Sequence, residues 1–305
     1  MKWDAVAELD EMRVFVRVVE LSSFAAAGED LRRTPSAISK LMGRLEARLG
    51  VQLLTRTTRR LSLVEERETF LRRCREILAA VEVAEAEVGG ASRQLSGRIK
   101  INAGTGIGRH QLASVLPKFL AAHPKVNVEI AINDRRIDVM AENVDVALRA
   151  GTLSDSSLVA RKIAEGRRII CASPDYLAKH GTPRRPEDLL GHNCISLSAL
   201  EQLSSWPFWS NGQLERIRVS GNVQTDSTDV ILDLAVAGEG IIRMTDTQVG
   251  RSVQSGLLVP LLEDVHVDEP VLFWALSPPG RNRVPRIRAM LDFLAEQFAK
   301  QPWKI

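Results

Sequence analysis

The sequence has no apolar run of the length that crosses a membrane. Its apolar stretches all fall short of the roughly 18 consecutive residues that a membrane-spanning helix needs. Residues 1–12 (MKWDAVAELDEM) lack the apolar segment and the small-residue cleavage site of a secretory signal. We therefore expect a cytoplasmic protein with no membrane partner.

Cysteine and histidine are scarce and scattered. Cys74, Cys171 and Cys194 are odd in number and lack the spacing of a disulfide framework or a zinc site. Cys171 and Cys194 are conceivable as a redox-sensing pair, but buried, unreactive thiols are the default interpretation. No nucleophile stands at motif spacing from any of the five histidines, which are His110, His123, His180, His192 and His266. The sequence thus predicts no metal, no cofactor and no enzyme.

The length and composition fit a globular protein of more than one domain. A chain of 305 residues suits two or three domains that each bury a core. Apolar residues make up 45% and charged residues 26%, which is ordinary for a folded chain.

Positive charge is concentrated in one segment. Residues 31–63 carry eight basic side chains against the single acid Glu46, a net charge of +7, whereas the whole chain has only +3. Residues 1–30 carry −4 and residues 64–90 carry −3. This distribution is typical of a surface that tracks a polyanionic backbone.

The same segment predicts helices followed by a wing. Apolar residues at helical spacing indicate a helix near residues 9–19 and a short one, FAAAGEDL, capped by Ser22 or Ser23. Gly28 inside the short helix costs about 1 kcal/mol relative to alanine, so we expect something to pack closely there. Thr34-Pro35 then begins a helix that Gly50 ends.

The helix of residues 35–49 separates an apolar face from a face of small and basic residues. The first face contains Ile38, Leu41, Met42, Leu45 and Leu49, and the second Ser36, Ser39, Lys40, Gly43 and Arg44. Small side chains let a helix enter the major groove deeply, and Gly43 permits a close approach. Taken alone, the pattern also describes an ordinary solvated helix face.

A predicted wing follows this helix. Val51, Leu53 and Leu54 are expected to form a short strand, residues 55–60 a basic tip, and Leu61 and Leu63 the return strand. Arginines and hydroxyl groups at the tip suit contacts to phosphate and to the minor groove.

The run from FVRVVELSSFAAAGEDL through PSAISKLMGRLEARLGVQLLTRTTRRLSL resembles the DNA-binding domain of LysR-type transcriptional regulators. The resemblance is specific over about 80 residues and weaker along the rest of the chain. It implies that residues 35–49 read the major groove and that the wing grips the backbone. The implied DNA-binding residues are Ser23, Thr34, Pro35, Ser36, Ser39, Lys40, Gly43, Arg44, Arg56, Thr57, Arg59 and Arg60.

Two positions depart from the family pattern after the wing. Val64 stands where the family usually has threonine, and Arg67 where it has glycine. Val64 has no side-chain oxygen to cap the next helix, so that helix is expected to fray at its start or begin elsewhere.

The next helix, about Glu65 to Val88, shows a heptad pattern. Its apolar positions are spaced alternately by four and three residues, namely Phe70, Cys74, Ile77, Val81, Ala84 and Val88. The resemblance implies that two such helices pair in a homodimer, or in a dimer of dimers (a homotetramer). The alternative is that this face packs on the core of its own chain.

Beyond a glycine-containing hinge, strands and helices alternate. We predict strands at 98–104, 126–132, 145–150, 167–173, 217–223, 240–244 and 271–276, and helices at 109–123, 135–143, 227–237, 247–254 and 284–298. The fold class is therefore α/β with an all-helical-plus-wing head. The resemblance implies a two-lobed effector-binding domain like the periplasmic binding proteins, with the last strand returning to the first lobe.

The predicted domains are a winged helix-turn-helix at 1–64, a linker helix at 65–90, a hinge at 91–97 and a two-lobed regulatory domain at 98–305. The second lobe is expected at about 165–268. By resemblance, the effector cleft is lined by Thr105, Gly106, Ile107, Arg149, Ser198, Phe208, Thr225, Asp226, Ser227 and Arg243.

Two features of this cleft follow from residue chemistry. Arg149 or Arg243 can hold a carboxylate ligand through two parallel hydrogen bonds, although an arginine more often forms a surface ion pair. Residues 104–108 (GTGIG) lie between a strand and a helix, as in a dinucleotide-binding turn, but the glycine spacing and the distance to the next acid are wrong for one. A turn with backbone amides at the cleft is the preferred interpretation.

The sequence therefore predicts a LysR-type transcriptional regulator. Its expected partners are double-stranded promoter DNA, a second copy of itself, a small-molecule effector of unknown identity and, when it activates, RNA polymerase. The alternative is a solute-binding or enzymatic α/β protein with an incidental helical head.

Overall fold

The computed structural model describes residues 5–56, 61–62, 65–89, 94–133, 137–153, 157–197, 201–210, 212–301 and 303–304. The chain divides into two compact units, one of Met1–Arg93 with Arg283–Pro285 and one of Gln94–Asn282 with Arg286–Ile305. Among the described residues, no helix combines the length and the apolar character needed to cross a membrane.

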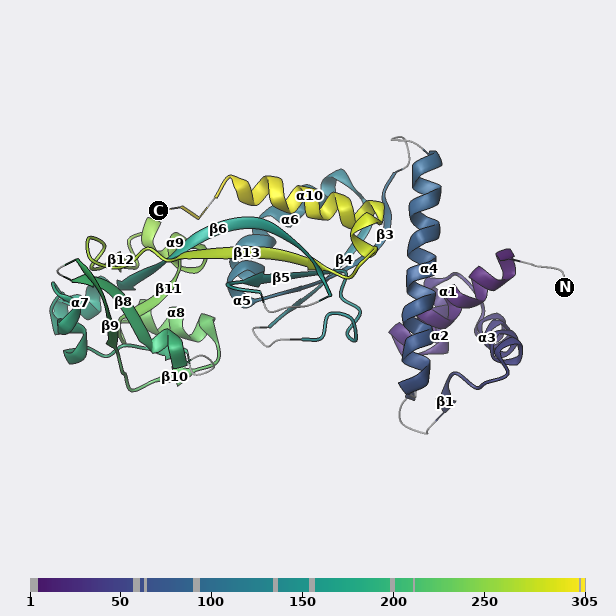
Figure 1. Cartoon of the computed structure of the whole chain (residues 1–305), viewed down its shortest axis with the longest axis horizontal. Helices are drawn as coiled ribbons and strands as arrows, with labels where there is room; N and C mark the ends of the chain where they lie inside the picture. The colour runs from purple at the N-terminus through teal and green to yellow at the C-terminus, as the bar shows by residue number, and fades with distance from the viewer. Residues whose placement is uncertain are drawn as a thin grey trace. The chain divides into compact units, whose positions relative to one another are not determined.

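The first unit is helical apart from a small hairpin (Figure 1). Its elements are α1 (Ala5–Leu21), α2 (Phe24–Asp30), α3 (Pro35–Leu49), β1 (Thr55–Arg56), β2 (Leu61–Ser62) and α4 (Glu65–Gly89). Phe15, Ile38, Leu45 and Cys74 are fully buried and belong to one apolar cluster, so α1, α3 and α4 share a core. That shared core fixes α3 on the unit while leaving its other face outside.

The predicted strand at Val51, Leu53 and Leu54 is not formed, because the first wing strand begins only at Thr55. The backbone amides of Leu53 and Leu54 donate to Oε1 of Glu46 at 2.8 and 3.2 Å instead of to a neighbouring strand. Both leucine side chains are buried in the core. The carboxylate of Glu46 therefore fixes the turn that leads into the wing.

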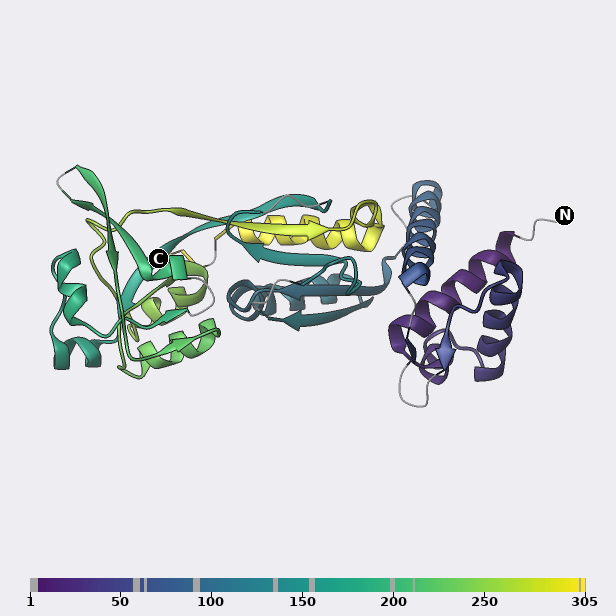
Figure 2. The same cartoon turned by 60° about the horizontal axis from the view of Figure 1, so that its bottom comes forward.

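The second unit contains two lobes that share long strands. One sheet runs in the order β11-β6-β13-β5-β3-β4, with β12 also paired to β6. Its strands are β3 (Ser96–Ala103), β4 (Lys125–Ile132), β5 (Val146–Ala150), β6 (Val159–Ala172), β11 (Ile242–Thr245), β12 (Val259–Pro260) and β13 (Pro270–Ser277). Strand β6 pairs with β13 over its first half and with β11 over its second, so it crosses from one lobe to the other (Figure 2).

The first lobe is built on β3, β4 and β5, which pair in parallel. Its helical segments are α5 (Thr105–Ile107), η1 (Gly108–Leu112), α6 (Ala113–Ala122) and α10 (Pro285–Ala299). Strand β13 pairs with β5 from Phe273 opposite Ala150 to Leu276 opposite Ala147. The prediction that the last strand returns to the first lobe is confirmed.

The second lobe adds helices and short strands around the far end of β6. These are α7 (Pro174–His180), η2 (Pro186–Gly191), β7 (Ser196–Leu197), η3 (Glu201–Ser204), β8 (Ser205–Ser210), β9 (Gln213–Arg218), β10 (Gln224–Thr225), α8 (Thr228–Val236) and α9 (Asp246–Gln254). The β8–β9 hairpin lies beside α7 at the end of this lobe in both Figure 1 and Figure 2.

Two predicted elements of the second unit differ from the structure. The predicted helix at 135–143 is absent over its described residues 137–143, which form turns. Oδ1 of Asp138 accepts hydrogen bonds from the amides of Met140 and Ala141, and Asn143 has a left-handed φ of 57°. The predicted strand at 217–223 ends at Arg218, because β9 pairs with β8 over Gln213–Arg218.

Candidate nucleic-acid interface and effector site

Helix α3 begins and ends as its sequence predicts. Oγ1 of Thr34 accepts a hydrogen bond from the amide of Ala37 at 3.3 Å, and Pro35 occupies the first helical position. Gly50 ends the helix with a left-handed φ of 69°. These caps satisfy backbone groups that a helix end leaves unpaired, so α3 has a defined length and orientation in the first unit.

The two faces of α3 differ sharply in exposure. Ile38, Leu41, Met42 and Leu45 are buried in the core. The opposite face is exposed to solvent and consists of Thr34, Pro35, Ser36, Ser39, Lys40, Gly43 and Arg44. A Cβ atom added at Gly43 would meet nothing within 4 Å, so that part of the helix backbone has open space in front of it.

Only part of the positive charge in this segment is available to a ligand. Arg33 forms an ion pair with Asp10 at 2.8 Å, and Arg48 pairs at 3.1 Å with Glu11, whose side chain is 8% exposed. The side chains of Lys40 and Arg44 form no ion pair or hydrogen bond with the described residues. The free cations thus lie on the same face of α3 as the small side chains.

The wing is a hairpin in which β1 and β2 pair antiparallel, with Thr55 opposite Ser62 and Arg56 opposite Leu61. The structure describes only the backbone of these strands. Of the predicted wing residues, Thr57, Arg59 and Arg60 lie outside the described residues.

Ser23 has a structural role in the head. Its Oγ accepts a hydrogen bond from the amide of Ala26 at 3.2 Å and so caps α2. The close packing expected at Gly28 is present, because a Cβ there would lie 2.7 Å from the backbone oxygen of Arg33. Gly28 therefore lets the turn between α2 and α3 pass over the helix.

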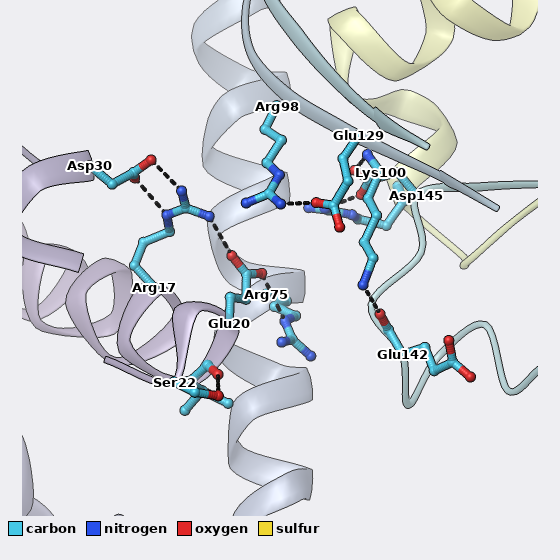
Figure 3. A network of polar contacts seen from close by, with 12 residues as sticks. Arg17, Glu20, Ser22, Asp30, Arg75, Arg98, Lys100, Glu129, Glu142 and Asp145 are labelled. Atoms are coloured by element: carbon cyan, nitrogen blue, oxygen red, sulfur yellow. Dashed lines mark hydrogen bonds and ion pairs between the residues drawn. The ribbon is translucent and has the colours of Figure 1, made fainter. Parts of the chain in front are cut away.

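A polar network ties three helices of the first unit together (Figure 3). Arg17 of α1 donates to Asp30 of α2 at 2.7 Å and to Glu20 at 2.8 Å. Arg75 of α4 lies 3.7 Å from the same glutamate. These contacts hold α4 against α1 and connect α1 to α2.

The predicted heptad face of α4 divides into two parts. Phe70 packs against Phe15 with ring centroids 5.5 Å apart, and the Cys74 side chain is fully buried in the head. Cys74 therefore has no surface left for a second helix. Ile77 and Val88 are exposed, at 42% and 91%, and Val81 is half-buried. The alternative of packing on the chain's own core thus describes the first half of this helix.

In the second unit, a separate network holds the base of the first lobe. Asp145 is buried, and its carboxylate accepts a hydrogen bond from the Lys100 amide at 2.9 Å and forms an ion pair with Arg281. The Lys100 ammonium donates to the backbone oxygen of Glu142 at 2.9 Å (Figure 3). These contacts anchor the turn that precedes β5.

The lobes meet beside the loop that follows β3. A Cβ added at Gly106 would lie 2.8 Å from Cδ of Gln248 on α9, so the absence of a side chain permits the contact. Nε2 of Gln111 donates to the backbone oxygen of Thr247 at 2.5 Å. Among the predicted effector residues, Thr105, Gly106 and Ile107 are therefore brought against the second lobe.

Ser227 and Thr225 shape the start of α8. Oγ of Ser227 accepts from the amide of Val230 at 3.4 Å, and Oγ1 of Thr225 accepts from the amide of Ser227 at 3.1 Å. Asp226 between them is exposed. Ser198 lies outside the described residues.

Phe208 does not line a cleft in this structure. Its side chain is fully buried, and its ring meets His266 edge to face with centroids 5.9 Å apart. The reason is the β8–β9 hairpin, which the sequence analysis did not predict and which turns Phe208 into the apolar cluster of the second lobe.

The two predicted arginines have internal partners. Arg149 at the end of β5 donates to the side-chain oxygen of Asn102 and, at 2.9 Å, to the backbone oxygen of Leu148. Arg243 on β11 donates to Nε2 of His266 at 2.8 Å and to Glu269 at 3.3 Å.

The three cysteines are reduced and buried. Burial raises the pKa of Cys171 and of Cys194 to about 12. Cys171 and Cys194 belong to two different apolar clusters of the second lobe. Thiols of this kind carry little thiolate at neutral pH, and thiolate is the reactive form.

Comparison with known proteins matches both units to one family. Residues 9–66 match the model of "Bacterial regulatory helix-turn-helix protein, lysR family", and residues 92–299 match "LysR substrate binding domain". The chain is 36% identical over 289 residues to the HTH-type transcriptional regulator CrgA of Neisseria meningitidis serogroup B, covering 95% of this chain and 96% of CrgA.

Solved structures agree with this match. The structure of CrgA, a LysR-type transcriptional regulator, aligns with a TM-score of 0.65 and 35% identity over 95% of this chain and 98% of CrgA. The full-length structure of AphB, a virulence activator of Vibrio cholerae, aligns with a TM-score of 0.59 and 27% identity over 95% of this chain and 99% of AphB.

Proposed function

The chain belongs to the LysR family of transcriptional regulators, and we propose that the exposed face of α3 and the β1–β2 hairpin carry its contacts to promoter DNA. It is a DNA-binding regulator with an effector-binding domain, and the alternative of a solute-binding or enzymatic protein is not favoured by these matches. From this membership we propose a regulatory rather than a catalytic role.

The exposed face of α3 is the observation that carries the DNA-binding proposal. It combines short side chains, a bare backbone at Gly43 and two cations whose side chains have no partner among the residues that the structure describes. Short side chains let a helix approach base edges, and free cations attract phosphate. Ser36 and Ser39 are proposed to contact bases, and Lys40 and Arg44 to contact phosphates.

The remaining predicted DNA contacts belong to the caps and the wing. Thr34 and Pro35 are proposed to lie next to the backbone at the N-terminus of α3, where amides favour phosphate. Ser23, as the cap of α2, is proposed to do the same at the shorter helix. In the wing, Arg56, Thr57, Arg59 and Arg60 are proposed to grip the flanking duplex.

We further propose that two chains pair through the exposed part of α4. The surface would use Ile77, Val81, Ala84 and Val88, since Cys74 is covered by its own head. The exposed apolar edge of this 25-residue helix would be buried by such a partner, and the helix would gain stability. Pairing would also place two readers on one promoter.

The proposed domains follow the two units. Residues 1–64 would read DNA, 65–90 would pair chains, 91–97 would act as the hinge and 98–305 would bind the effector, with the second lobe at about 165–268. A bound small molecule would favour one arrangement of the two lobes and would thereby change how the DNA-binding units are placed. The residues proposed to hold it are Thr105, Gly106, Ile107, Arg149, Thr225, Asp226, Ser227 and Arg243. Contact with RNA polymerase and action in the cytoplasm are proposed from the regulatory role.

A gel-shift titration against salt tests DNA binding. Neutralisation of phosphates predicts a linear fall of log affinity with log salt, with a steep slope. Ser36→Ala and Ser39→Ala should change the sequences that the protein selects from a random duplex pool, while general affinity remains. An absence of duplex binding at low salt would refute the proposal, and an unchanged selection profile would remove the two serines from base contact.

A further inference from the structure

Two arginines lie on one face of neighbouring strands in the second lobe. In the antiparallel register, Arg243 of β11 is opposite Ile170 of β6, and Thr245 is opposite Arg168. Side chains two residues apart on a strand share a face, so Arg168, Arg243 and Thr245 project from the same side of the sheet. The side chain of Arg243 is 3% exposed, whereas Arg168 is half-buried.

Arg243 is held in place by neutral and acidic partners. Its Nε donates to Nε2 of His266 at 2.8 Å, so this ring nitrogen carries no proton. Its Nη2 lies 3.3 Å from Oε2 of Glu269, the second partner. Glu269 also accepts from Arg216 at 3.0 Å. One carboxylate thus serves two guanidinium groups.

Arg168 completes an excess of positive charge. Its side chain forms no hydrogen bond or ion pair with another residue in the part of the chain that the structure describes. Burial and then the charge of Arg168 lower the pKa of Arg243 to about 10. Burial, followed by the charge of Arg243, lowers the pKa of His266 to about 4, so the ring is neutral at neutral pH. Arg168, Arg216 and Arg243 therefore face the single negative charge of Glu269.

We infer that Arg168 and Arg243 form a binding site for the oxyanion group, a carboxylate or a phosphate, of a small-molecule ligand. Guanidinium groups bind such oxygens in a planar, two-pronged geometry, and partial burial strengthens the attraction. His266 acts as a positioning residue, because it holds Nε of Arg243 while Glu269 accepts from Nη2, and Nη1 is left to the ligand. His266 is in turn backed by the buried ring of Phe208.

This inference rests on the proposed function, since the ligand would be the effector of the regulatory domain. It adds Arg168, which sequence reasoning did not identify, and it states the chemical class of the ligand. It also gives the buried ring of Phe208 a role, which is to support His266 from behind.

Isothermal titration of the full chain with succinate, benzoate and inorganic phosphate at constant ionic strength tests the site. We expect saturable binding of at least one of the three, and the responding probe distinguishes carboxylate from phosphate recognition. Arg168→Gln should weaken that binding at least tenfold. Glu269→Gln should tighten it, because the competing internal carboxylate is then neutral.

Arg167→Gln is the matched control. Arg167 is the preceding residue of β6, points to the other face of the sheet and lies 4.0 Å from Glu263. Its loss should change oxyanion affinity less than threefold. Equal affinity of wild type and Arg168→Gln, or the absence of saturable binding by all three probes, would overturn the inference. A gel shift of the same wild-type preparation with promoter DNA is the second measurement. If the preparation binds the promoter but no oxyanion, only the inference about the oxyanion site is wrong. If it does not bind the promoter either, the proposed function is wrong as well.

Discussion

Nη1 of Arg109 lies 2.6 Å from Oδ2 of Asp229, and this ion pair joins the first lobe to the second. The other oxygen of the same carboxylate lies 3.0 Å from Nε2 of His110. Asp229 stands in the first turn of α8, where the helix dipole also favours a negative charge. One carboxylate therefore connects η1 of the first lobe with α8 of the second, beside the proposed effector residues.

Asp229→Ala should loosen the contact between the lobes without unfolding either. Arg109 is 62% exposed, so the pair contributes less than about 1 kcal/mol to folding. Its loss should instead raise the amide exchange rate in η1 and in the first turn of α8, because each of these segments loses a partner. Hydrogen exchange followed by mass spectrometry measures this.

The exposed pair of Arg161 and Asp292, 2.6 Å apart, supplies the control for that experiment. Asp292→Ala removes a similar ion pair that lies within the first lobe. Faster exchange in η1 and α8 of this variant would show that the effect does not come from the lobe contact.

Gly43→Ala should stabilise the protein and weaken its binding to DNA. An alanine inside an exposed helix is more stable than glycine by about 1 kcal/mol, and nothing lies within 4 Å of the added Cβ. On DNA the same methyl group would stand between the helix and the duplex. Thermal unfolding followed by circular dichroism and a gel shift of the same sample measure the two effects.

Gly28→Ala should have the opposite effect on folding stability and serves as the comparison for Gly43→Ala. Its Cβ would lie 2.7 Å from the backbone oxygen of Arg33, so the turn before α3 must shift and stability should fall by roughly 1–3 kcal/mol. If Gly43→Ala left the affinity for DNA unchanged, close approach at that position would be excluded.

Local signals in the sequence predicted the head well and the second lobe less well. Helix α3 carries its own start and stop, in Thr34, Pro35 and Gly50, and the structure follows them. The hydrogen bonds from the Glu46 carboxylate to Leu53 and Leu54 are tertiary contacts that no local pattern reports. The apolar residues Val51, Leu53 and Leu54 predict a strand by their pattern, although this segment forms a turn with two buried leucines.

Burial against distant parts of the chain explains the other differences. Cys74 fits a heptad, but its spacing cannot tell a partner chain from the head of its own chain. Phe208 is turned inward by the hairpin partner Glu215 opposite it and by a bridge to His266, 58 residues later. Arg168 gave no motif at all, because its significance comes from the strand register with Thr245.

Asp246 should make the stability of the second unit fall as the pH rises through the acidic range. Burial raises the pKa of this carboxyl from 3.8 to about 6, even though the amide of Thr247 donates to it at 2.8 Å. The folded chain therefore binds a proton that the unfolded chain releases between these two values. The stabilisation is fully present below about pH 4 and is lost by about pH 6, on the order of 3 kcal/mol.

Asp246→Asn removes this pH dependence, because an asparagine side chain does not titrate in this range. Its amide oxygen can still accept the hydrogen bond from the amide of Thr247. Urea unfolding followed by tryptophan fluorescence measures it, since four of the five tryptophans lie in the second unit. As the pH rises from 4 to 7, the unfolding free energy of the variant should increase relative to that of the wild type. A difference that stays constant over this range would contradict the raised pKa.

Arg44 and Arg48 should affect DNA binding differently, although they lie one turn apart on α3. Arg44 has no ion pair with the described residues, so Arg44→Gln should remove one phosphate contact and reduce the slope of log affinity against log salt by about 1. Arg48 is held 3.1 Å from the buried carboxylate of Glu11, so Arg48→Gln should leave the slope unchanged. It should instead lower the folding stability by roughly 1–3 kcal/mol, because Glu11 loses its partner. Gel shifts at four salt concentrations and a thermal melt of each variant measure both effects. An equal change of slope in the two variants would mean that the ion pair with Glu11 opens on DNA, and Arg48 would then count among the charges available to phosphate.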